Sequence, residues 1–167
     1  LEKTVGLEKG GYRALFIDDF NVNEDGSLPI QKGTKEGVAQ VVSFNPYDEI
    51  PAATFATSRN VVVTDSQTLC PVKNGAYICI KGVDLSKGAK EIEFTFAKAV
   101  KRGFRSSDSI KVMINNFGAN GTVIGEAKLN KKNVLNCDLK LSESDSKVCD
   151  LYFVFSGNCE LKSWKMK

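Results

Sequence analysis

Residues 74–99 read NGAYICIKGVDLSKGAKEIEFTFAKA, two strand-like segments joined by a turn rich in Gly, Asp and Ser. In the second segment Ile92, Phe94 and Phe96 alternate with polar residues, and this period of two sends all three side chains to one face of a sheet. The first segment, residues 77–83, is apolar on both faces except at one lysine, which is typical of a strand packed inside a sandwich. The stretch therefore predicts a sheet whose apolar face is covered by a second layer.

Strand signals recur along the chain, separated by turn residues, and no helical period of useful length interrupts them. Trp164, the only tryptophan, is most simply a core residue. The pattern predicts an all-β fold, an antiparallel β-sandwich of the jelly-roll type. Further strands are expected at residues 52–56, 61–64, 110–114, 139–141 and 151–155.

Composition restricts the possible partners. The 167 residues suffice for one domain with a full core, or one domain with an appendage. The net charge is +3, and lysine is scattered among acidic residues, which argues against nucleic acid as the partner. No apolar run approaches the roughly 20 residues that span a bilayer, so we expect a soluble chain without a membrane partner.

The first 40 residues differ from the rest. Residues 1–10 are polar, residues 12–20 read as a strand, and Asn23–Gly26 is a strong turn signal followed by a short extended run. A hairpin is therefore expected here. Because the chain starts at Leu1 without a methionine or a signal peptide, we interpret it as a piece of something longer.

Histidine is absent, which removes the commonest general base and the commonest transition-metal ligand. The five cysteines form no CxxC pair, so a zinc or thioredoxin-like site is not indicated. Two interpretations of them stay open. They are small buried apolar residues, or two of them form one disulfide in an oxidising compartment.

Three segments in order resemble the family 6 carbohydrate-binding modules. Residues 74–99 are similar to the central strands of that family, GTVIGEAKL at 121–129 to its Gly-Thr-x-Ile-Gly strand, and VCDLYFVFSGNCELKSW at 148–164 to its closing hairpin. The resemblance implies a β-sandwich that binds polysaccharide and has no catalytic residues. It covers residues 41–167, and residues 1–40 form a preceding linker and hairpin.

The hairpin region has its own resemblance. Residues 12–38, YRALFIDDFNVNEDGSLPIQKGTKEGV, are similar to the last stretch of family 43 glycoside hydrolases, whose catalytic carboxylates lie far upstream. Asp18 and Asp19 are adjacent, so on a strand they point to opposite faces and cannot flank one glycosidic bond. The resemblance implies that this chain is not an enzyme, and that its partner is the catalytic domain of a parent hydrolase.

The family's structural calcium ion is held by carboxylates of an Ile-Glu-Ala-Glu strand and by the Asp before the last Trp. This chain has Pro51 and Ala53 where that strand is acidic, and Ser163 before the tryptophan. Calcium requires several oxygen donors. We therefore expect no metal here, with apolar or neutral packing in its place, and no cofactor elsewhere.

The family's sugar cleft is also depleted. Its two aromatic walls align with Pro71 and with residues 130–134, and its asparagine aligns near Leu161, so all three cleft elements are missing. Two surfaces remain as candidates for sugar binding: the loop around Phe117, with Asn116 and Asn120, and a concave sheet face near Glu91, Glu93 and Thr95. Amide and carboxylate groups can hydrogen-bond sugar hydroxyls, and Phe117 offers a flat apolar face.

Two functions follow from these resemblances. In the first, the chain is a module with a degenerate cleft and calcium site, appended to a secreted, extracellular hydrolase of plant cell-wall polysaccharide such as xylan. In the second, it is a structural spacer that packs between domains and binds no glycan. The sequence does not select the glycan, the specificity of the parent enzyme or the oligomeric state.

Overall fold

The computed structural model describes residues 22–28, 30, 43–64, 66–97, 108–145 and 147–167. The chain divides into two units, residues 1–41 and 42–167. In the first unit, the Gly26 amide donates to the Asn23 carbonyl at 2.9 Å, and Gly26 has a φ of 80°. The turn expected at Asn23–Gly26 is therefore confirmed, while the strand expected at 12–20 lies outside the described residues.

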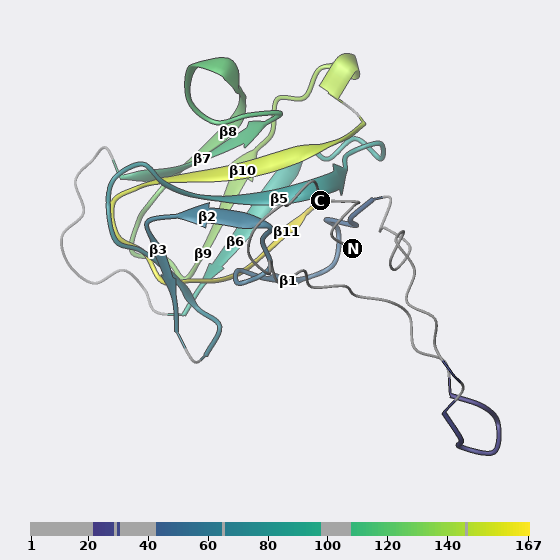
Figure 1. The fold of residues 1–167 in the computed structure, drawn as a ribbon. Coiled ribbons are helices and arrows are strands. Elements are labelled where there is room, and N and C mark those ends of the chain that lie inside the picture. Colours follow the sequence, from purple (N-terminus) through teal and green to yellow (C-terminus); the bar gives the residue numbers. More distant parts are fainter. Residues whose placement is uncertain (1–21, 29, 31–42, 65, 98–107, 146) are drawn as a thin grey trace, which may run out of the picture. The chain divides into compact units, whose positions relative to one another are not determined.

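The described part of the second unit is a sandwich of two sheets whose paired strands are all antiparallel (Figure 1). Five strands form one sheet, in the order β2 (Thr57–Arg59), β5 (Ala76–Asp84), β10 (Val148–Ser156), β7 (Ser109–Ile114) and β8 (Thr122–Lys128). Six strands form the other, in the order β3 (Val61–Val63), β4 (Leu69–Pro71), β11 (Leu161–Met166), β6 (Glu91–Phe96) and β9 (Val134–Asp138), with β1 (Ile50–Pro51) also paired to β11. The predicted β-sandwich is confirmed.

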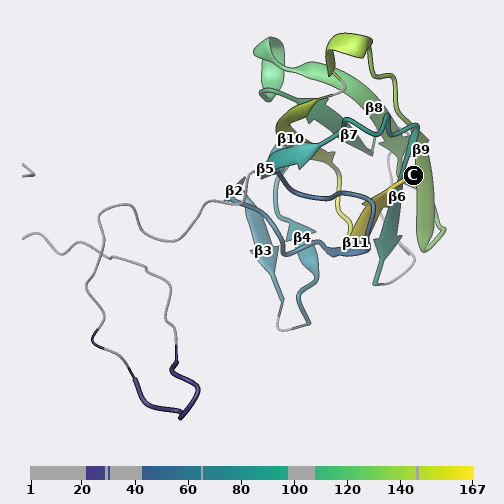
Figure 2. The same cartoon turned by 90° about the vertical axis from the view of Figure 1, so that its right-hand side faces the viewer.

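The two strands of the opening stretch lie in different sheets, so the turn between them crosses from one layer to the other (Figure 2). In β6, Ile92, Phe94 and Phe96 are all buried, as their alternation predicts. In β5 the alternation of inward and outward side chains is interrupted at Gly82. There the backbone is left-handed with φ 65°, and the pairing with β10 shifts register. This irregularity turns Val83 back into the core.

Aromatic rings from both sheets meet in the core. Phe153 of β10 packs edge-on against Phe94 of β6, with ring centroids 5.2 Å apart, and against Trp164 of β11, at 5.1 Å. Edge-to-face contacts of this kind add to the free energy gained by burying the rings. The prediction that Trp164 is a core residue is confirmed, since it is 1% exposed.

Two expected strands are wrong. Residues 52–56 form no strand, because the Thr54 amide turns back to the Pro51 carbonyl at 2.9 Å. Residues 139–141 also lie outside the strands. The Leu139 amide donates to Lys90 beside β6, whereas the Lys140 amide donates to Ile124 in β8. The segment thus divides its hydrogen bonds between the sheets and continues neither ladder.

The segment before β1 is bound to both sheets. The Phe44 amide donates to the Gly82 carbonyl at 2.7 Å, and the Asp84 amide donates back to Phe44 at 2.9 Å. On the other sheet, the Met166 amide donates to the Pro46 carbonyl at 2.8 Å. Residues 44–46 therefore close one end of the sandwich.

All five cysteines are free thiols, and four of them are buried. Burial raises the pKa of Cys149 to about 11 and that of Cys159 to about 12, so both stay protonated at neutral pH. This structure favours the interpretation of the cysteines as small core residues. Among the described residues, no helix is long and apolar enough to span a membrane.

Candidate functional site

Three aromatic rings gather on the outer face of the five-stranded sheet, and we call Tyr77, Phe117 and Tyr152 the aromatic patch. Tyr77 and Tyr152 alternate with buried residues of β5 and β10, so they point away from the core. Phe117 stacks on Tyr77, with ring centroids 4.2 Å apart and planes 25° apart, and lies 5.8 Å from Tyr152. The patch joins two strands and one loop.

The loop after β7 folds back over the sheet to bring Phe117 there. Asn115 and Gly118 both have a left-handed backbone, and the Phe117 amide donates to Asn116 Oδ1 at 2.8 Å. At Gly121 there is no room for a side chain, because a Cβ would clash with the Asn116 carbonyl oxygen and lie 2.9 Å from Met113 Cε. The loop is thus held by backbone conformation and by one close approach.

The Tyr152 hydroxyl of the patch and the Cys79 thiol are protonated at physiological pH. Tyr152 pairs across strands with Cys79 on one side and Met113 on the other. Burial, followed by a side-chain hydrogen bond to Cys79, raises the pKa of Tyr152 to about 12. Burial also raises the pKa of Cys79. The patch therefore offers apolar stacking and a protonated hydroxyl.

The structure keeps the three loop candidates together. Phe117 is 39% exposed, and among the described residues no other aromatic side chain is exposed to this degree. Asn116 is half-buried beside it, and Asn120 is exposed in the short 3-10 helix η1, Gly118–Asn120. A stacking ring flanked by amides is a suitable arrangement for a sugar.

Glu91 and Glu93 lie elsewhere, on the outer face of the six-stranded sheet. Lys167 Nζ is 3.2 Å from Glu91 and 2.7 Å from Glu93, and Lys165 Nζ is 3.2 Å from Glu93. The hydrogen bond from Lys167 is the main cause that lowers the pKa of Glu93. These carboxylates are already paired, and the sandwich separates them from Phe117.

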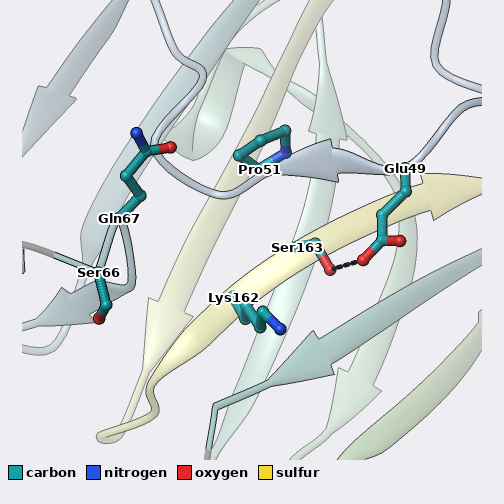
Figure 3. Close-up of a pocket in the computed structure, with 6 residues that line it drawn as sticks. All are labelled: Glu49, Pro51, Ser66, Gln67, Lys162 and Ser163. Atoms are coloured by element: carbon teal, nitrogen blue, oxygen red, sulfur yellow. Dashed lines mark hydrogen bonds between the residues drawn. The ribbon is translucent and has the colours of Figure 1, made fainter.

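Glu49 and Ser163 meet at a surface pocket of about 260 Å³ (Figure 3). The Ser163 hydroxyl, on β11, donates to Glu49 Oε1 at 2.7 Å, and Pro51, Ser66, Gln67 and Lys162 complete the lining. The packing is therefore not purely neutral, since one carboxylate stays at the position where the sequence resemblance expects calcium ligands. Lys162 belongs to the same lining.

These residues do not fit a calcium ion. Calcium takes roughly six to eight oxygen ligands, whereas the described lining contributes one carboxylate, already hydrogen-bonded, beside a cation. Nor do the described residues contain any group of three His, Cys, Asp or Glu side chains that could hold a metal. The absence of a metal at this position stays a prediction.

Sequence reasoning missed Tyr77 and Tyr152 as parts of the candidate site. In β10, Tyr152 stands between Leu151 and Phe153, which both point into the core. The alternation of side chains along a strand therefore predicts that the Tyr152 ring points outward. What the sequence does not show is that a loop beginning some 40 residues after Tyr77 returns to cover it.

No family model matches the chain. Two curated relatives are each named "Arabinoxylan arabinofuranohydrolase". One, from Bacillus subtilis, is 26% identical over 124 residues, which is 69% of this chain and 23% of the relative. The other, from Paenibacillus polymyxa, is 25% identical over 167 residues, 92% of this chain and 25% of the relative. The chain spans about a quarter of the length of these relatives.

Solved structures give the fold. A family 6 carbohydrate-binding module from Clostridium cellulolyticum, in complex with xylose, matches with a TM-score of 0.61 and 19% identity over 74% of this chain and 99% of that module. The fold is that of a family 6 carbohydrate-binding module. The family 43 arabinoxylan arabinofuranohydrolase from Bacillus subtilis, in complex with cellotetraose, also matches with a TM-score of 0.61, at 19% identity over 90% of this chain and 33% of the enzyme. Both resemblances inferred from the sequence are thereby confirmed.

The three positions that the resemblance assigns to the cleft of family 6 modules carry no exposed ring here. Pro71 and Leu161 are buried in β4 and β11. Asn130, Lys131 and Lys132 are exposed and polar. Among the described residues of this fold, Phe117 carries the most exposed aromatic ring.

Proposed function

We propose that this chain is a non-catalytic module that binds plant cell-wall polysaccharide through the aromatic patch. The observation that carries the proposal is the exposed Phe117 ring held on Tyr77 at 4.2 Å. A ring fixed from behind keeps its orientation without a ligand, so a sugar loses little affinity to ordering it. The C–H face of a sugar packs against such a ring.

The proposed polysaccharide is a xylan or a related glucan. Two similar structures support this class, since they are described in complex with xylose and with cellotetraose. The curated relatives, of which this chain matches about a quarter, support a parent enzyme of the family 43 type that is secreted and degrades plant polysaccharide. In this proposal the usual cleft of the family is degenerate, and the patch replaces it.

We propose that no metal takes part. The Ser163 hydroxyl donates to Glu49 and links β11 to the residue preceding β1, the role that an ion bridging the same strands would otherwise have. The cationic Lys162 in the pocket also disfavours a bound cation.

Native affinity electrophoresis of the whole chain in gels containing soluble xylan tests the proposal. We expect retardation by xylan, and its loss in Phe117→Ala. Val134→Ala is the matched control, because Val134 is 45% exposed on β9 of the other sheet. This variant should be retarded like the unaltered chain.

The alternative is a structural spacer without glycan binding. The lack of aromatic rings at the family's cleft positions favours this alternative. Absence of retardation by xylan, by a soluble cellulose derivative and by a mixed-linkage glucan would support this role over the first. The spacer role also predicts that removing the module destabilises the parent enzyme without changing its polysaccharide preference.

A further inference from the structure

Three basic residues, Arg59, Lys81 and Lys111, lie on the outer face of the five-stranded sheet, which also carries the aromatic patch. One row of cross-strand partners runs Arg59, Tyr77, Val154, Lys111 and Glu126 across β2, β5, β10, β7 and β8. Partners directly opposite on one face have Cβ atoms about 5 Å apart. Arg59 is therefore a direct neighbour of the tyrosine on which Phe117 rests.

The cations of this face differ in how well they are balanced. Lys111 is opposite Glu126, and Lys81 of β5 lies near Asp150, whose Oδ1 accepts a hydrogen bond from the Gly82 amide at 3.3 Å. Arg59 is exposed and forms no hydrogen bond or ion pair with any residue in the described part of the chain. Lys81 and Lys111 form no hydrogen bond or ion pair with a described residue either, but each has a carboxylate beside it, whereas the cross-strand partner of Arg59 is the neutral Tyr77.

An arginine of this kind matches a carboxylate. The guanidinium presents a planar fork of N–H donors that binds both oxygens of one carboxylate, and it is more weakly hydrated than an ammonium group. A neutral sugar hydroxyl accepts from one such donor, and no attraction between opposite charges is added. Beside a stacking ring, Arg59 therefore adds affinity for a sugar that carries an acid group.

We infer that the preferred ligand is a polysaccharide with uronic acid units, of which one sugar rests on Phe117 while the carboxylate of a uronate pairs with Arg59. The inference rests on the proposed function, because it needs sugar binding at the patch. It assigns Arg59 as the residue that sets specificity, and Lys81 and Lys111 as weaker contributors through the local positive potential.

Calorimetry with two xylo-oligosaccharides of equal length, one neutral and one bearing a glucuronic acid, tests the inference on the whole chain. We expect the acidic ligand to bind about tenfold more tightly at low salt, as for one hydrogen-bonded charge pair. This preference should shrink in 0.5 M NaCl, because salt screens the pair while stacking persists.

Variants separate this inference from the proposed function. Arg59→Gln should remove most of the preference and leave binding of the neutral ligand within about twofold, and Arg59→Lys should restore part of the preference. Lys90→Gln removes the same charge in the turn before β6 and should keep the preference. Phe117→Ala should weaken the binding of both ligands.

The contrary outcomes are distinct. Equal affinity for the two ligands, or a preference that persists in Arg59→Gln, would overturn the inference while leaving the glycan-binding proposal intact. Binding of neither ligand would overturn both. Displacement of the acidic ligand by polyglutamate, which offers carboxylates without a sugar ring, would reduce Arg59 to a general anion site and also overturn the inference.

Discussion

Phe117 lies nearly parallel to Tyr77, with 4.2 Å between the ring centroids, although a loop carries one ring and a central strand the other. The contact therefore serves two purposes. It anchors the loop to the sheet, and it presents the outer face of Phe117 in a fixed orientation.

The coupling between these rings is measurable. Phe117→Leu and Tyr77→Leu should each destabilise the chain, and the double variant should be destabilised by less than the sum. The difference should be about 0.5–1.5 kcal/mol, the range for paired aromatic rings. Urea unfolding of the four proteins gives this value. Phe117→Leu combined with Val134→Ala should be additive, since Val134 lies on the other sheet; additivity in both pairs would contradict the contact.

Gly121 should resist substitution for lack of space. An alanine there places Cβ against the Asn116 carbonyl oxygen and near Met113 Cε, so the loop must move and Phe117 with it. We expect Gly121→Ala to lower the free energy of unfolding by about 1–3 kcal/mol, as in other overpacked sites, and to weaken xylan retardation.

The neighbouring Gly118 provides the control for this effect. It has a left-handed backbone with φ 76° and open space where a Cβ would lie. Asparagine adopts that conformation more readily than most residues with a side chain, so Gly118→Asn should cost about 1 kcal/mol or less, which is less than Gly121→Ala. A Gly121→Ala variant as stable as Gly118→Asn would show that the loop is not folded as described.

The hydrogen bond between Ser163 and Glu49 should replace a metal in function. Ser163→Ala removes a donor to a carboxylate, and because Glu49 is exposed and can be rehydrated, we expect a loss of about 1 kcal/mol in urea unfolding. The melting temperature should be the same in EDTA and in millimolar calcium. A rise with calcium that EDTA abolishes would contradict a metal-free module.

The pairing of Glu93 with Lys167 and Lys165 should make stability depend on pH. Because the folded-state pKa of Glu93 lies below its ordinary value of 4.5, its charged form stabilises the fold above that pH. The contribution is lost as the pH falls below 4.5 and through the lowered folded-state pKa.

Glu93→Gln tests this dependence. The difference in melting temperature between the unaltered chain and the variant should be largest near neutral pH and should shrink as the pH falls from 5 toward 3. Glu143→Gln, at an exposed position of η2 (Glu143–Asp145), is the control and should show a small difference at every pH. If the difference in melting temperature between the unaltered chain and Glu93→Gln does not change with pH, the ion pairs of Glu93 make no measurable contribution to stability.

The alternation of apolar and polar residues predicted most of the fold. It placed Ile92, Phe94 and Phe96 in the core and put Tyr152 on the face opposite Leu151. Alternation works here because a buried face constrains every second residue of a long strand.

The short segments were harder to place, since their structure depends on partners distant in sequence. Residues 52–56 look extended, yet the turn at Thr54 breaks them. Residues 139–141 look like a strand, yet their amides go to both sheets. The same reason explains the candidate site: the sequence shows Phe117 in an Asn- and Gly-rich loop, but not the return of that loop across β10 to Tyr77.

The Phe44–Pro46 segment has a mechanical consequence. Its hydrogen bonds go to Gly82 and Asp84 of one sheet and to Met166 of the other. A pull on the chain at this point is shared between the two layers at once, instead of peeling a single edge strand away. A tether entering here transmits force to the sandwich as a whole.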